Sequence, residues 1–87
     1  MRIYQRDSEP VERDRGVPRP SFTLTPRECQ VLNCIKEGHS NRLVGRTLGI
    51  SERTVKVHLH SIFIKLGVAS RTEAVIAGIR NGAINLY

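Results

Sequence analysis

The chain has 87 residues, which allows one small domain with a thin hydrophobic core. Fourteen Lys and Arg against eight Asp and Glu give a net charge of +6 and a pI near 10.2, which suits a polyanionic partner but is equally compatible with a merely soluble surface. No apolar run approaches the roughly 18 residues of a membrane span, and the charged N-terminus does not resemble a signal peptide. We therefore expect a cytoplasmic protein without membrane contact.

The cysteines and histidines do not form a catalytic or metal site in this sequence. Cys29 and Cys34 lie five apart on a predicted helix, so their side chains point about 140° apart and cannot form a disulfide with each other. His58 and His60 lie about 200° apart around a helix, which excludes a shared metal ion. No Cys/His or carboxylate pair has the spacing of a catalytic site. The sequence predicts no cofactor, no metal and no enzymatic activity.

Residues 1–21 differ in composition from the rest of the chain. Residues 1–20 hold five Arg, four acids and three of the four prolines, with few apolar residues. Such a segment cannot bury enough apolar surface to order its backbone, so we predict a flexible, disordered linker or tail before a domain at 22–87. A less favoured alternative is a minor-groove DNA arm built on Arg13, Arg15 and Arg19, since interleaved acids weaken it.

The first predicted helix runs from Pro26 to about Glu37. Thr25 followed by Pro26 at the first helical position and by Glu28 three residues after the cap forms a capping box. Gly38 supplies a left-handed C-cap. Its apolar residues Val31, Leu32 and Ile35 share a face, and Leu24 before the helix can pack back against it.

A short second helix is predicted over residues 41–48, with Ser40 as its cap. Its predicted inner residues are Leu43, Val44, Thr47 and Leu48, and its outer ones Arg42 and Arg46. A helix N-terminus leaves backbone N–H groups unpaired, so its start beside Arg42 is a candidate anion site.

The third predicted helix, residues 51–66, has two faces. Its core stripe at helical spacing is Val55, Leu59, Ile62, Phe63 and Leu66. The opposite side carries Arg53, Val57, His60 and Ile64, flanked by Lys56 and Lys65. A helix, a tight turn at Gly49 and a second helix with a cationic outer face are typical of a helix-turn-helix DNA-binding motif.

The fourth predicted helix, residues 71–81, opens with a second capping box of Ser70 and Glu73 and stops at Gly82. Residues 74–79 are all Ala, Val, Ile or Gly, more apolar than one core contact requires. Ile76 and Ile79 are left over, next to Arg80, so we expect them to form a dimer interface.

Several separated motifs occur in order: Leu24-Thr25-Pro26-Arg27-Glu28, Gly38-His39-Ser40-Asn41, Ile50-Ser51-Glu52-Arg53-Thr54-Val55-Lys56-Val57-His58, Lys65-Leu66-Gly67-Val68 and Ser70-Arg71-Thr72-Glu73-Ala74-Val75. Over about residues 22–85 they resemble the DNA-binding domain of the LuxR/FixJ (GerE-type) transcription regulators. The resemblance implies an all-α four-helix domain whose third helix enters the major groove and whose fourth mediates dimerisation on a two-fold symmetric site. It also implies either an output domain that follows a sensor or receiver, or a short stand-alone member.

The resemblance assigns roles by position. Lys56, Val57 and His60 match positions that reach base edges, although Lys or Arg is more usual at His60, and Arg53 could contact bases or phosphate. Together with Arg42 at the start of the second helix, the residues expected to contact phosphate are Ser40, Asn41, Thr54, Lys65 and Arg71.

Ile64, Gly45 and Gly78 depart from the family pattern, where a charged residue and two alanines are more usual. Each glycine is expected to soften its helix by up to about 1 kcal/mol relative to alanine. The rival function is a protein-interaction module that binds a regulator or RNA polymerase through Ile64, Ile76 and Ile79. The cations Arg53 and Lys56 on the exposed face argue against it as the sole role.

Overall fold

The computed structural model describes residues 23–86 and shows four α-helices and no strand in that range. The linker predicted at 1–21, and its minor-groove alternative, lie outside the described residues. The helices are α1 (Pro26–Lys36), α2 (Asn41–Leu48), α3 (Glu52–Leu66) and α4 (Arg71–Arg80). The all-α, four-helix prediction is confirmed.

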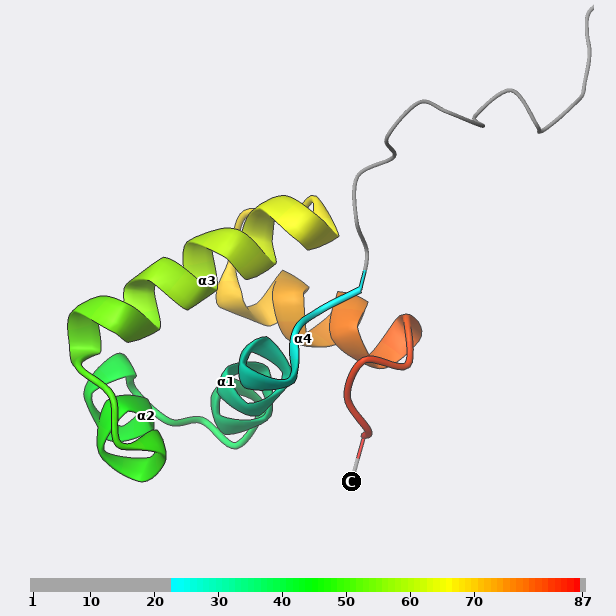
Figure 1. Ribbon diagram of the computed structural model, residues 1–87. Helices are drawn as coiled ribbons and strands as arrows, with labels where there is room; N and C mark the ends of the chain where they lie inside the picture. The colour runs from blue at the N-terminus through cyan, green and yellow to red at the C-terminus, as the bar shows by residue number, and fades with distance from the viewer. Residues whose placement is uncertain (1–22, 87) are drawn as a thin grey trace, which may run out of the picture.

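α1 contacts each of the other three helices, as does α3. α3, the longest, packs on α1, α2 and α4, and Figure 1 shows it lying across one side of the domain. The buried apolar residues are Leu24, Val31, Leu32, Cys34, Ile35, Val44, Val55, Leu59, Ile62, Ala74 and Ile84. Burial raises the pKa of the Cys34 thiol, and the negative charge of Glu37 adds to this, so Cys34 stays protonated and serves as a small apolar residue.

Local signals define the helix boundaries. Each helix begins after a hydroxyl residue whose side chain accepts a hydrogen bond from the third backbone N–H of the helix; the four caps are Thr25, Ser40, Ser51 and Ser70. Gly49 and Gly67 end α2 and α3 in the left-handed conformation, at φ 73° and 68°. The capping box at Thr25 is complete. At Ser70 it is not, because the carboxylate of Glu73 accepts from the N–H of Ala69, one residue earlier.

The inner face of α2 differs from the prediction. Leu43 is 41% exposed and Thr47 is exposed, whereas Val44 and Gly45 are buried. Gly45 explains the difference: a Cβ atom at this position would lie 2.6 Å from the carbonyl oxygen of Ile50. The missing side chain lets the turn after α2 pack against the helix, which turns Leu43 and Thr47 outward.

The chain after α4 returns to the core. Ile84 is only 4% exposed, and Lys36 Nζ donates to the carbonyl of Asn85 at 2.8 Å. A Cβ atom on Gly78 would lie 2.6 Å from Leu32 Cδ2 and 3.3 Å from Ile84 Cγ1. Gly78, like Gly45, is therefore a site of close packing, and the lower helix propensity expected of both glycines stays a prediction.

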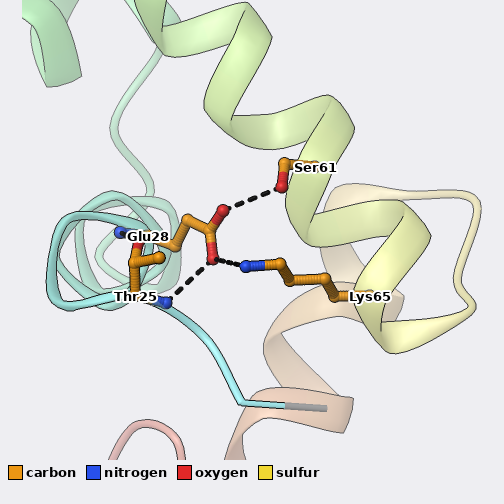
Figure 2. Close-up of polar contacts among 4 residues, drawn as sticks. All are labelled: Thr25, Glu28, Ser61 and Lys65. Atoms are coloured by element: carbon orange, nitrogen blue, oxygen red, sulfur yellow. Dashed lines mark hydrogen bonds and ion pairs between the residues drawn. The ribbon is translucent and has the colours of Figure 1, made fainter. Parts of the chain in front are cut away.

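Glu28 links α1 to α3 (Figure 2). Its Oε1 accepts from Lys65 Nζ at 2.8 Å and from the N–H of Thr25 at 2.9 Å, and its Oε2 accepts from Ser61 Oγ at 2.8 Å. The residue is 5% exposed. We call these four residues, Thr25, Glu28, Ser61 and Lys65, the Glu28 network.

Charge and hydrogen bonding decide the ionisation of Glu28. Burial alone would raise the pKa of its carboxyl group, but the hydrogen bonds from Lys65, Thr25 and Ser61, with the positive charge of Lys65, lower that pKa from 4.5 to about 2. The folded state therefore favours the carboxylate more than the unfolded chain does. This preference contributes on the order of 2–3 kcal/mol to stability at neutral pH.

We expect Gly45→Ala to destabilise the domain by about 1–2 kcal/mol, because the clash with the Ile50 carbonyl outweighs the better helix propensity of alanine. Urea unfolding followed by circular dichroism measures the change. Thr47→Ala, on the exposed side of the same helix, is the control and should shift stability by no more than about 0.5 kcal/mol. A Gly45→Ala domain as stable as the wild type would mean that the turn relaxes freely.

The pKa of Glu28 predicts a specific acid sensitivity. Because it is lower in the folded state than in the unfolded chain, its stabilising contribution is present above about pH 4.5 and is lost as the pH falls toward 2. Unfolding free energies of the wild type and Glu28→Gln, measured at several pH values, should therefore differ by about 2–3 kcal/mol less at pH 2 than at pH 6. If the difference in unfolding free energy between the two proteins were the same at pH 2 and pH 6, the lowered pKa of Glu28 would be contradicted.

Candidate nucleic-acid interface

The exposed face of α3 carries the residues predicted to reach base edges. Arg53, Lys56, Val57 and His60 are all exposed, and Val57 is 62% exposed. Their spacing places them along the side of α3 that faces away from Val55, Leu59 and Ile62, which are buried. The sequence therefore located this surface correctly, although the contacts themselves stay predictions.

The charge of this face is predominantly positive. Arg53 and Lys56 project from the first two turns of α3, and Glu52 at the helix start is the acidic residue beside them. Exposed Val57 lies between the cations and His60. Cations beside an exposed apolar side chain suit a DNA groove, in which phosphates line both sides and base edges form the floor.

The starts of α2 and α4 are joined by a side-chain contact. The guanidinium of Arg71 donates to the side-chain oxygen of Asn41, which brings together two residues predicted to contact phosphate. Ser40 Oγ, the cap of α2, accepts from the N–H of Leu43 at 3.2 Å, and Arg42 beside it is exposed. These four residues form a polar, cationic cluster at the N-terminal end of α2.

Two further residues predicted to contact phosphate have partners within the domain. Thr54 Oγ1 lies 2.9 Å from Ser51 Oγ, at the cap of α3, and Thr54 is half-buried. Lys65 is paired with Glu28 in the Glu28 network. This ion pair uses one of the three donors of the Lys65 ammonium group, so the phosphate contact of Lys65 stays a prediction.

The residues predicted for dimerisation divide into exposed and half-buried ones. Ile76 is 47% exposed and Arg80 is exposed, but Ile79 packs partly against the domain's own core. Ile76 and Arg80 border an open hollow of about 400 Å³ between α4 and the end of α3, whose apolar lining includes Leu66 and Val68. Ile76 is thus the more accessible of the two isoleucines.

The amino-acid sequence did not reveal the role of Ser61 or the long-range contacts of Glu28. Glu28 carried a signal, since its place in the capping box was evident, but its contacts with Ser61 and Lys65 join positions 33 and 37 residues apart. The sequence did not indicate a role for Ser61, because a single serine on the side of a helix is equally compatible with exposure to solvent. Only the packing of α1 against α3 brings the two together.

Within residues 23–86, no three His, Cys, Asp or Glu side chains are grouped in a way that would hold a metal ion. The same part of the chain contains no helix that is both long and apolar enough to span a membrane.

Comparisons with known proteins agree with this geometry. The model of the luxR family of bacterial regulatory proteins, GerE, matches residues 22–77. The transcriptional regulatory protein DegU of Brevibacillus brevis is 46% identical over 68 residues, which make up 78% of this chain and 29% of DegU. The CsgBAC operon transcriptional regulatory protein of Escherichia coli K12 is 49% identical over 55 residues, 63% of this chain and 26% of that protein. The chain thus spans less than a third of these curated relatives.

Solved structures show the same fold. Transcription factor GerE is similar with a TM-score of 0.71 and 33% identity, over 77% of this chain and 98% of GerE. The response regulator ChrA of a heme-sensing two-component system is similar with a TM-score of 0.71 and 40% identity, over 79% of this chain and 34% of ChrA. The chain therefore belongs to the luxR family of bacterial regulatory proteins, and its four-helix domain is the DNA-binding domain of a transcription regulator.

Proposed function

We propose that this domain recognises a specific duplex sequence by placing the exposed face of α3 in the major groove. The observation that carries the proposal is the exposure of Arg53, Lys56, Val57 and His60 along one face of a helix whose opposite face is buried. From Arg53 to His60 this face is about 10 Å long, a length that fits within the groove.

Each of these side chains suits a particular contact. Lys56 can donate hydrogen bonds to the acceptors of guanine, and Val57 can contact the methyl group of thymine. His60 can accept or donate at a base edge when neutral, or pair with phosphate when protonated. Arg53, near the start of α3, can reach either a base or the adjacent backbone.

Phosphate contacts are proposed for the cluster at the N-terminal end of α2. Unpaired backbone N–H groups and the helix dipole attract anions there, and Arg42 and Arg71 add positive charge. Ser40 and Asn41 of this cluster, and Thr54 near the start of α3, can donate hydrogen bonds to phosphate oxygens. Such contacts orient the domain on DNA without distinguishing sequences.

Dimerisation on a two-fold symmetric site is proposed for α4. Ile76 is an exposed apolar side chain beside the hollow lined by Leu66 and Val68, so a second copy would cover apolar surface there. Arg80 borders the same hollow, and Ile79 would contribute only its exposed part.

The whole protein is proposed to be a regulator in which a sensor or receiver controls this output domain, as the lengths of the relatives suggest. Contact with another protein, RNA polymerase among the candidates, is the second proposed function. It is favoured by Ile64, which is 64% exposed on the half of α3 beyond the proposed base contacts.

Lys56→Ala should weaken binding to a selected two-fold symmetric duplex about 10- to 100-fold and should flatten the preference at one base pair. Fluorescence anisotropy with selected and scrambled duplexes, titrated at several salt concentrations, measures both effects. The wild type should prefer the selected duplex and lose affinity steeply with salt.

The control is Lys36→Ala, which removes the same charge from α1, where Lys36 donates to Asn85. It should lower affinity for both duplexes equally and only slightly. An equal loss on both duplexes for Lys56→Ala would instead make Lys56 a phosphate contact.

Ile76→Glu should separate dimerisation from groove binding. A buried, unpaired carboxylate in the proposed α4 interface should reduce affinity for a duplex with two half-sites at least about tenfold, and leave binding to a single half-site nearly unchanged. Thr72→Glu, an exposed substitution on the same helix, controls for the added charge. An equal loss on both duplexes, no greater than that of the control, would place the dimer contact elsewhere.

A further inference from the structure

We propose that Glu28 determines sequence specificity from the interior of the domain, by fixing the rotation of α3 about its own axis. This proposal rests on the proposed function, because it concerns how the face of α3 is presented to the groove. Glu28 is thus a positioning residue and makes no contact with DNA itself.

The apolar contacts of α3 hold the helix against the domain but restrict its rotation weakly. Val55, Leu59 and Ile62 are buried within a sector of about 60° around the helix axis. Contacts of this kind have no preferred direction, since their free energy depends mainly on the area removed from water. A small roll of α3 would keep most of this burial.

The Glu28 network contacts α3 on a different side from the buried apolar residues. Ser61 and Lys65 are four residues apart, so they project from neighbouring positions on one side of the helix. This side lies about 110° around the helix axis from the three buried residues. It lies about 110° from the centre of the exposed Lys56–His60 face as well. Both donate to the carboxylate of Glu28 at 2.8 Å. Hydrogen bonds are directional, so a roll of α3 would stretch or bend both of them.

The other end of the network is anchored. Glu28 Oε1 also accepts from the N–H of Thr25, and the N–H of Glu28 donates to Thr25 Oγ1 at 3.1 Å, so the carboxylate is fixed to the first turn of α1. Since Glu28 is 5% exposed, little water is available to replace these bonds. α1 in turn contacts the three other helices, so the orientation of α3 is set relative to the whole domain.

A small rotation would be enough to disturb base recognition. Side-chain tips lie about 6 Å from a helix axis, so a roll of about 20° moves them by about 2 Å. A hydrogen bond to a base edge does not tolerate such a displacement, whereas attraction to phosphates is less directional. Loss of the network should therefore reduce specific binding much more than non-specific binding.

A substitution that tests this network must remove both acceptor oxygens of Glu28. These two oxygens accept from three donors, those of Thr25, Ser61 and Lys65. A glutamine amide could keep these contacts, because its oxygen can accept from Thr25 and Lys65 while its NH₂ group donates to the Ser61 hydroxyl, which can accept as well as donate. Glu28→Met keeps the length of the side chain while removing both acceptors, which makes it the sharpest variant.

The test compares selected and scrambled duplexes by fluorescence anisotropy at pH 7 and at a temperature where circular dichroism shows each variant folded. For Glu28→Met, the ratio of the two dissociation constants should fall about tenfold, while affinity for the scrambled duplex stays within about twofold. Ser61→Ala, which removes one of the three bonds, should give a smaller fall of about threefold and replaces Glu28→Met as the test if that variant does not fold. The double variant should lose little more than Glu28→Met alone.

Two controls separate positioning from charge and from stability. Glu37→Met makes the same charge change at an exposed position, and should leave the ratio unchanged. Ile62→Val destabilises the buried face of α3 without removing a directional bond, and should also leave the ratio unchanged. Unchanged ratios in folded Glu28→Met or Ser61→Ala, or an equal fall in Ile62→Val, would overturn the proposal. A wild type without preference for the selected duplex would instead refute the proposed function.

Discussion

The buried carboxylate of Glu28 is the interaction on which the arrangement of this domain depends. It accepts hydrogen bonds from the start of α1 and from two positions on α3, and burial without these donors would disfavour its charge. Removing one partner from such a site costs more than the net contribution of a single hydrogen bond. In a domain with a thin apolar core, these directional bonds orient the helix that carries the exposed cations Arg53 and Lys56.

Three sides of α3 have different roles. Val55, Leu59 and Ile62 supply the core, Ser61 and Lys65 hold the orientation, and the remaining side presents cations around Val57 to solvent. Lys65 illustrates this division, because it is cationic and lies on α3 but pairs with Glu28 of α1. The two lysines of α3 thus differ in role, because Lys56 and Lys65 project from different sides of the helix.

Much of this architecture follows from local sequence. The caps, the glycine stops and the apolar stripe of α3 act over a few residues, so helix boundaries and the exposure of Lys56 were predictable. The inner face of α2 was not, because Gly45 makes a backbone contact that periodicity does not register. Nor was the pairing of Lys65, since it joins residues 37 apart, or the burial of Ile84, which follows the last helix.

Nuclear magnetic resonance of the labelled domain, titrated with a selected two-fold symmetric duplex, tests base recognition by α3 most directly. The predicted result is that the largest amide shifts fall at Lys56, Val57 and His60, and that the methyl groups of Val57 show nuclear Overhauser effects to base protons in the major groove. Shifts confined to Ile64 and Ile76, with the first two turns of α3 unaffected, would contradict it.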